Sequence, residues 1–442
     1  MKNNIASMIL AVLLIGAFGA PAAYGQTIIV RRGPAVMLSV STPYCVQIGP
    51  FDFFPPSLAG TGGGHVGISA SAVLVDGSRQ RLNLDSDPRT DLVVINNDDT
   101  VSVFHNVSGT SVAQVNTYPT TMPGAQLARL SDLNLDGQLD LIVGNASSFS
   151  IFYNDGTNSG TFVTPPQVIQ YGGFWTGQPL IEFAVADFNA DSYPDIAALV
   201  GQNGVATIEN NGGTFSGGFT NHVFALLYPQ RSFEAMLINS DDQLPDLVVT
   251  NNHLPDLPGF FTVQTLNGLR NTSQPGGAIS FVRDLTDSVD FDVDAAGFAD
   301  GDFDNDGDSD VFLFRDDTLQ LTFVENVGAP AGSQTLLAGQ AFPTNLSTAD
   351  VRLRSADINK DGFLDVILAA NQPPPNVAVL FGNGDGTLSS PKVFAAGQTG
   401  PLWFDARDLS GYQGGLDGDI DVVTVGAMDL AVLKNAIIPC GE

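Results

Sequence analysis

Positive charge is scarce in this sequence of 442 residues. It contains 17 Lys and Arg against 47 Asp and Glu, which gives a formal net charge of −30 at pH 7. Only four of the cationic residues are lysines. Such a surface repels polyanions, so nucleic acid and anionic membranes are poor partners for it. We therefore expect no nucleic-acid partner.

Sequence motifs of common catalytic centres are also missing. Neither G-x-S-x-G nor H-E-x-x-H occurs, and the four histidines, His65, His105, His222 and His253, share no repeat position. A pair of carboxylates acting as acid and base has no motif, so the acidic residues leave a polysaccharide lyase or hydrolase open. Catalysis is therefore uncertain, and the sequence favours a protein that is not an enzyme.

Long apolar runs are confined to the N-terminus. Residues 1–25 contain one Lys, an apolar run and the small-residue end AYG before Gln26, which is typical of a cleavable secretory signal. The alternative is an uncleaved membrane anchor, but the run is short and no second span follows it. We expect a secreted or periplasmic protein that is not inserted in a membrane.

The remaining composition indicates a turn-rich β protein. The chain has 48 Gly and 26 Pro, only 14% charged residues and 43% hydrophobic residues, enough to fill a core. No stretch after residue 25 shows a convincing apolar run at helical spacing.

Nine residues, DFDNDGDSD at 302–310, hold an unusual density of carboxylates. Close carboxylates repel one another unless a cation lies between them. The spacing 1, 3, 5 followed by Gly is similar to the start of an EF-hand calcium loop, but the last acidic residue is at position 9 and an apolar run, VFLF, follows directly. A hairpin loop around a hard cation fits this pattern.

The pattern recurs along the chain. Well-kept copies begin at Asn83, Asp132, Asp187, Asp302 and Asp357. Two degraded copies precede Asp246, where a residue is interpreted as lost and Ile238 takes position 1, and Asp421, where an insertion follows Asp408. The final Asp residues are 49 to 64 residues apart, which indicates seven repeated units.

Each unit contains four short segments rich in Val, Ile, Phe and Tyr, bounded by turn residues. We predict an all-β fold: a seven-bladed β-propeller of four-stranded antiparallel blades, over residues 49–442. Only two strands follow the seventh loop, so an N-terminal strand, for which 68–75 is the candidate, is expected to complete the last blade. Residues 26–48 lead to this closure, and a closed ring favours a monomer.

Two cysteines, Cys45 and Cys440, lie just outside the closing segments. We predict that they form a disulfide that staples the ring, worth about 4 to 5 kcal/mol by loop-length entropy. The alternative is two buried free thiols.

The Asp loops, together with the turn VLFGNGDGTLSSPKVF, resemble the FG-GAP or VCBS repeats, which include the propeller of integrin alpha subunits. The resemblance covers nearly all of the chain beyond the N-terminal region. It implies several structural calcium ions, each held by side chains at positions 1, 3, 5 and 9 and a backbone carbonyl at position 7.

Carried over to this sequence, the resemblance implies ligands in six loops, of which the loops at 83–91 and 408–421 are the less regular. They are Asp302, Asp304, Asp306 and Asp310 with the carbonyl of Asp308; Asp132, Asn134, Asp136 and Asp140; Asp187, Asn189, Asp191 and Asp195; Asp357, Asn359, Asp361 and Asp365; Asn83, Asp85, Asp87 and Asp91; and Asp408, Ser410, Asp417 and Asp421.

All-oxygen ligands in flexible loops favour calcium over zinc, copper or magnesium. The ions are expected to be structural, since each would neutralise several carboxylates in a hairpin.

Two further interpretations concern function. One is a module that binds a glycan or an extracellular protein. The resemblance to integrin propellers implies a ligand on the face away from the calcium loops, where Tyr171, Phe174 and Trp175 are candidate contacts. The same aromatic residues, and Trp403, can instead belong to the core. A purely structural extracellular role is the remaining alternative.

Overall fold

The structure is a computed structural model, and it describes only part of the chain. The described residues are 57–60, 65–70, 84–85, 90–106, 112–157, 159–170, 179–201, 204–215, 220–223, 230–239, 243–251, 266–290, 295–330, 333–348, 350–372, 374–396, 403–407, 420–425, 429–433 and 435. They belong to one compact unit, Phe53–Asn435. Every regular element among them is a β-strand, which confirms the all-β prediction. Within these ranges there is no helix of the length and hydrophobicity needed to cross a membrane.

The strands form seven antiparallel sheets of four strands each. In six of them the strands follow one another in chain order from the innermost to the outermost strand. The first three contain β2 (His65–Ala70), β3 (Leu92–Asn96), β4 (Thr100–Asn106) and β5 (Val112–Pro119); β6 (Leu127–Ser131), β7 (Asp140–Gly144), β8 (Ser148–Phe152) and β9 (Gln167–Gln170); and β10 (Leu180–Ala186), β11 (Asp195–Val200), β12 (Gly204–Ile208) and β13 (Thr220–Val223).

The next three sheets repeat this order. They contain β14 (Gln230–Met236), β15 (Asp246–Asn251), β16 (Leu266–Asn271) and β17 (Phe281–Val289); β18 (Ala295–Gly301), β19 (Asp310–Arg315), β20 (Gln320–Asn326) and β21 (Leu336–Pro343); and β22 (Val351–Ala356), β23 (Asp365–Ala370), β24 (Asn376–Leu380) and β25 (Lys392–Ala395).

The seventh sheet joins the two ends of the propeller. It contains β26 (Trp403–Arg407), β27 (Asp421–Val425), β28 (Asp429–Leu433) and, as its outermost strand, β1 (Ser57–Gly60). The register pairs Ser57 with Val432 and Gly60 with Asp429. An N-terminal strand therefore completes the last sheet.

The candidate for this closing strand, residues 68–75, was wrong. Its first residues belong to β2, which pairs with β3 through Ile68 and Val94 and is the innermost strand of the first sheet. A strand must precede the first Asp loop just as one precedes every other loop, so the closing strand lies one segment earlier. The predicted disulfide cannot be compared with the structure, because Cys45 and Cys440 lie outside the described residues.

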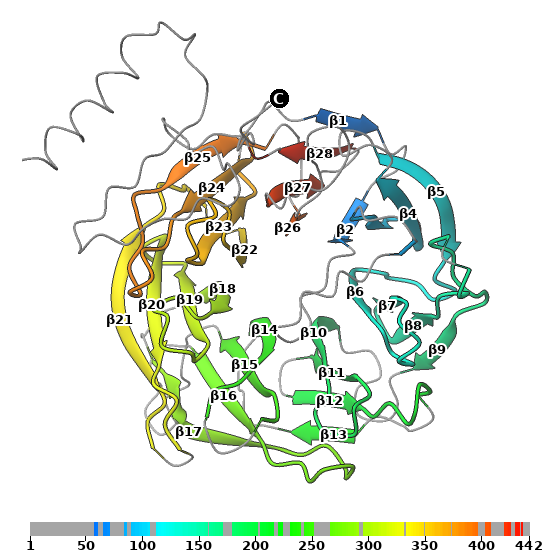
Figure 1. Cartoon of the computed structure of the whole chain (residues 1–442), viewed down its shortest axis with the longest axis horizontal. Helices are drawn as coiled ribbons and strands as arrows, with labels where there is room; N and C mark the ends of the chain where they lie inside the picture. Colours follow the sequence, from blue (N-terminus) through cyan, green and yellow to red (C-terminus); the bar gives the residue numbers. More distant parts are fainter. Residues whose placement is uncertain are drawn as a thin grey trace, which may run out of the picture. The chain divides into compact units, whose positions relative to one another are not determined.

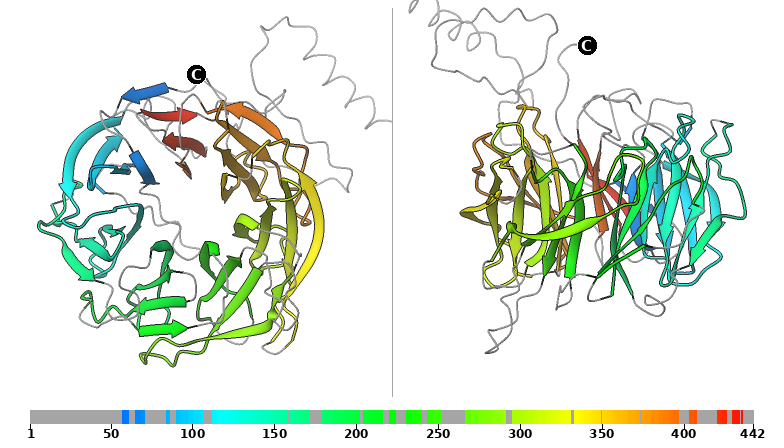
Figure 2. Two further views of the ribbon diagram at one scale, coloured as in Figure 1. Left: turned by 180° about the vertical axis from the view of Figure 1, so that it is seen from behind. Right: turned by 90° about the horizontal axis from the view of Figure 1, so that it is seen from below.

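The innermost strands close the ring. β2, β6, β10, β14, β18, β22 and β26 contact one another in this order, and β26 contacts β2. Figure 1 shows the sheets arranged radially around a common centre. In the side view of Figure 2 many strands run roughly along the ring axis. The chain therefore forms a β-propeller.

The hydrophobic core consists of layers between neighbouring sheets. One layer joins the second and third sheets through Phe149 and Phe183, and another joins the fifth and sixth sheets around Phe312. The strand after each Asp loop is covered on both faces by these layers, and all residues of β3, β7, β11, β23 and β27 are buried. This explains why the sequence after each loop is a continuous apolar run rather than an alternating one.

Substitution of Phe312 tests how much these layers contribute to the stability of the fold. Its side chain is fully buried, and its ring centroid lies 4.7 Å from that of Phe303 and 5.8 Å from that of Phe342. We expect Phe312→Ala to lower the free energy of unfolding by about 3 to 5 kcal/mol, because it leaves a cavity. Urea denaturation in saturating calcium measures this loss. Val282→Ala, at a side chain that is 39% exposed, is the control, and equal losses in both variants would contradict the prediction.

Candidate functional site

Four Asp loops lie entirely within the described residues and share one backbone path. They are the loops at 132–140, 187–195, 302–310 and 357–365, and each joins the innermost strand of a sheet to the next strand. Position 4 has a positive φ in all four, at Leu135, Ala190, Asn305 and Lys360. Position 6 also has a positive φ and is Gly in three loops, while Ser192 adopts it in the fourth. The expected Gly thus meets a backbone requirement.

Three of the loops satisfy their first carboxylate with backbone donors. In the loop at 132–140, the N–H groups of Asp136 and Gly137 donate to Oδ1 and Oδ2 of Asp132 at 3.0 and 2.8 Å. Asp187 and Asp357 accept equivalent bonds in their own loops. In the same loops the side chain at position 3 accepts the N–H of position 5, and the side chain at position 5 accepts the N–H of position 7.

The loop at 302–310 differs at its first carboxylate. Oδ1 of Asp302 is buried and has no hydrogen-bond partner among the described residues. One carboxylate oxygen from each of Asp302, Asp304 and Asp310 lies within 4.8 Å of the other two. A buried anionic oxygen beside two further carboxylates is costly without a cation, so these residues fit a hard divalent ion. The carboxylate of Asp308 lies against Gly328, and only its backbone carbonyl was predicted as a ligand.

The final Asp of each loop is the most buried member. Asp140 accepts the N–H of Leu133 with Oδ2 at 3.0 Å and the N–H of Asn154 with Oδ1 at 2.8 Å. The same pair of bonds holds Asp195, Asp310 and Asp365. Burial raises the pKa of Asp140, Asp195 and Asp310 to about 7 and that of Asp365 to about 8.

The final Asp is also present in the two degraded loops, those of the fourth and seventh blades. In the fourth blade, Asp246 accepts the N–H groups of Ile238 and Asn271 at 3.1 and 2.7 Å, although the loop has no acidic residue at position 1. In the seventh blade, Asp421 accepts the N–H of Asn435 at 2.8 Å. The final Asp of the loop therefore bonds to the end of the third strand of its sheet in these two blades as well.

The register corrects the interpretation of the fourth loop. Its flanking residues, Met236 and Asp246, are paired partners ten residues apart, whereas Ser131 and Asp140 in the second blade are nine apart. The fourth loop has therefore gained one residue rather than lost one, and Leu237, not Ile238, takes position 1. In the seventh blade, Arg407 pairs with Asp421, which agrees with an insertion there.

Several predicted ligands lie outside the described residues. They are Asn83 and Asp87 in the first loop and Asp408, Ser410 and Asp417 in the seventh. The candidate ligand contacts Tyr171, Phe174 and Trp175 also lie outside them, and for Trp403 only the backbone is described, in β26.

A recurring Asn that links neighbouring blades was missed by the sequence analysis. The side-chain amide of Asn210 donates to the carbonyl of Leu133 in the preceding blade at 2.7 Å, and Asn271 donates to Phe188 at 2.9 Å. Asn326 and Asn435 make equivalent bonds to Leu237 and Ile358. The signal was an Asn at the end of the third strand of most repeats, but only the fold shows that it reaches the Asp loop of the preceding blade.

The centre of the ring contains a pocket, named here the central pocket. Its cavity volume is about 50 Å³, and it is partly open to solvent. Its polar lining includes side chains from the innermost strands of four sheets: Arg129, Glu182, Ser232, Arg352 and Arg354. Phe298 and Phe404 add aromatic surface.

Opposite charges neutralise one another around this pocket. Nη2 of Arg129 lies 2.8 Å from Oε1 of Glu182, and Nε of Arg354 lies 3.8 Å from Oδ1 of Asp405. Burial acts to lower the pKa of Arg129, but the carboxylates of Glu182, Glu234 and Asp405 raise it. Burial raises the pKa of Glu234 to about 7 against the attraction of Arg129. Burial also raises the pKa of Asp300.

Glu234 gives the protein a predictable pH dependence. Its ordinary pKa is 4.5, so between pH 4.5 and about 7 the unfolded chain ionises this group while the folded chain keeps it protonated. The contribution of this group to the free energy of unfolding is fully present below pH 4.5 and is lost as the pH rises through about 7. Glu234→Gln cannot ionise and lacks this fall.

The variant should therefore gain stability relative to the wild type as the pH rises from 4.5 to 7, by about 3 kcal/mol. Chemical denaturation of both proteins at several pH values, in saturating calcium, measures the difference. Parallel stability curves would contradict a raised pKa at Glu234.

Comparisons with known proteins agree with this architecture. A family model described as an FG-GAP-like repeat matches residues 132–198 and 302–368. No curated protein matches the sequence.

Two solved structures share the fold at low identity. The BBS1N structure, solved in complex with ARL6DN, has a TM-score of 0.53 and 10% identity over 88% of this chain and 99% of its own. An Agrocybe aegerita lectin, solved for its recognition of non-reducing terminal N-acetylglucosamine, has a TM-score of 0.51 and 16% identity over 78% of this chain and 84% of its own. Both matched repeat segments begin at the first Asp of one loop and end in the strand that follows the next Asp loop. The chain therefore carries FG-GAP-like repeats on a β-propeller.

Proposed function

We propose that this protein is an exported, calcium-stabilised propeller that acts as a binding module for a glycan or an extracellular protein. The observation that carries the calcium part is the buried, unpartnered Oδ1 of Asp302 beside the carboxylates of Asp304 and Asp310. Calcium prefers oxygen ligands of this kind. The loops at 132–140, 187–195 and 357–365 have Asp at the same positions, with an Asn in place of Asp at position 3.

The binding part is supported by the central pocket. Its arginine and carboxylate side chains offer hydrogen-bond donors and acceptors in fixed pairs, and Phe298 and Phe404 offer apolar faces. Sugar hydroxyls and rings use both kinds of contact. The propellers similar to this chain include one solved with a protein partner and one solved for glycan recognition, so the proposal includes both ligand classes.

Catalysis is the second candidate, and one observation favours it. Burial raises the pKa of Glu234 and Asp300, which interact with Arg129 and Arg354 of the central pocket, and such carboxylic acids can serve as general acids in glycoside cleavage. A polysaccharide lyase or hydrolase therefore remains the alternative to a binding module.

Calcium binding is tested with a single-site variant. Removal of calcium with EDTA should lower the melting temperature of the wild type by roughly 5 °C or more, since a ligand that binds only the folded state stabilises it. Asp302→Asn should bind fewer calcium ions. Without calcium it should be at least as stable as the wild type, because it removes a buried charge, and with calcium it should be less stable.

Asp98→Asn, in an exposed turn between β3 and β4, is the matched control and should retain every calcium ion. Calorimetric titration counts the ions, and thermal denaturation gives the stabilities. An Asp302→Asn variant with the wild-type number of ions and the same calcium response would contradict calcium binding in this loop.

Ligand binding is tested by thermal denaturation in saturating calcium against a panel of oligosaccharides and polysaccharides. A dose-dependent rise in melting temperature with one sugar class is expected for a glycan-binding module. The rise should be smaller for Arg129→Met, which loses donors in the central pocket. Product analysis of the binding sugar, for the wild type and Glu234→Gln, then separates binding from cleavage. A panel without any shift would reject the glycan and leave a protein partner to be sought by pull-down.

A further inference from the structure

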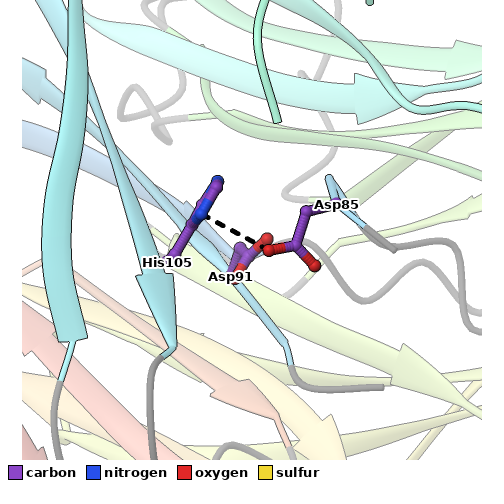
Figure 3. Close-up of side chains that lie close together, drawn as sticks. All are labelled: Asp85, Asp91 and His105. Atoms are coloured by element: carbon purple, nitrogen blue, oxygen red, sulfur yellow. Dashed lines mark ion pairs between the residues drawn. The ribbon is translucent and has the colours of Figure 1, made fainter. Parts of the chain in front are cut away.

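The first blade contains a cluster of a different composition from the other Asp loops. Figure 3 shows the side chains of Asp85, Asp91 and His105 turned toward one another. One oxygen of each carboxylate and one nitrogen of the imidazole lie within 4.8 Å of one another. Nδ1 of His105 lies 3.3 Å from Oδ2 of Asp85. Among the described residues no other such cluster contains a nitrogen ligand.

Secondary structure fixes these three side chains in place. Asp91 directly precedes β3 and His105 lies near the end of β4, and the pairing of Leu92 with Phe104 puts Asp91 opposite His105 in the ladder. Asp85 comes from the loop before β3, where its backbone forms a bridge with Ser159 of the second blade. The cluster is shielded, because Asp91 is fully buried and the side chains of Asp85 and His105 are only 15% and 19% exposed.

The imidazole can present only one nitrogen to the carboxylates. Nε2 is buried, and Gly160 packs so closely against it that a Cβ at this position would clash with the ring. Gly160 has a positive φ, so the turn that covers the imidazole also depends on this glycine. Nδ1 therefore faces Asp85 and Asp91.

His105 is specific to the first blade. The antiparallel registers place Tyr153, Glu209, Arg270, Glu325 and Phe381 at the same position in the next five blades. None of these side chains provides an imidazole. The final Asp of the loop, in contrast, is common to all seven repeats of the sequence.

We propose that Asp85, Asp91 and His105 form a binding site for a divalent transition-metal ion, with Zn²⁺ as the best fit. A mixed set of one imidazole nitrogen and two carboxylate oxygens suits zinc, whereas calcium takes oxygen ligands. Two ligand atoms about 2.1 Å from a tetrahedral zinc ion are about 3.4 Å apart, close to the observed Nδ1 to Oδ2 distance. Three protein ligands leave a fourth position for water or a further ligand.

The alternative for this cluster is a hydrogen-bonded ion pair between His105 and Asp85 that needs no metal. A second alternative is a calcium site that uses Asp85 and Asp91, as the resemblance of the first loop implied. Because the three possibilities differ in the ion bound and in the need for the imidazole, metal binding by the full chain distinguishes them.

The test is a calorimetric titration of the full chain with Zn²⁺ in saturating calcium. The wild type should bind one zinc ion that His105→Asn does not bind, or binds at least tenfold more weakly, and Asp85→Asn should show the same loss. His222→Asn, at a histidine in β13, is the matched control for adventitious binding and should retain the ion. Circular dichroism and melting in calcium establish that each variant is folded.

The coordination shell gives a second measurement that needs no variant. X-ray absorption at the zinc edge of the wild type should show one nitrogen ligand together with oxygen ligands. The proposal is overturned if the wild type binds no zinc in saturating calcium, if His105→Asn binds it as tightly as the wild type does, or if the shell contains oxygen alone.

Discussion

A buried carboxylate at the end of each Asp loop supports the rest of this propeller. In Asp140 and its counterparts, one oxygen accepts an N–H group from the loop and the other accepts an N–H group from the third strand. A carboxylate in the core is tolerated only when such donors surround it. These two bonds fix the loop against the sheet in every blade where both are described, including the fourth, which has lost its first acidic ligand. The fold therefore keeps this residue even where its neighbours vary.

Polar contacts also help to orient each blade relative to the preceding one. Apolar layers fill the space between sheets, but such layers specify orientation poorly because their contacts are not directional. The amide of Asn210 and its counterparts adds a directional bond from one blade to the loop of the preceding blade. The innermost strands then place arginines and carboxylates from separate repeats around one central pocket.

One loop scaffold can thus serve different ligand sets. The loop at 302–310 gathers oxygen atoms only, whereas in the first blade the strand β4 adds a nitrogen from His105. On our proposals the same hairpin holds calcium in some blades and a transition metal in another. The difference arises from a single residue opposite the final Asp, so such a change leaves the backbone of the blade intact.

The sequence by itself determined the all-β class, the repeats and the positions of the Asp loops, because these depend on spacing within short segments. The spacing of 302–310 and its copies was sufficient to locate every loop described here. The tertiary structure alone decided that Ser57–Gly60 closes the ring, that the fourth loop is one residue longer, that Asn210 bonds to Leu133, and that His105 lies opposite Asp91. Each of these depends on strand register or on contacts between residues far apart in the chain, and neither is encoded in a local pattern.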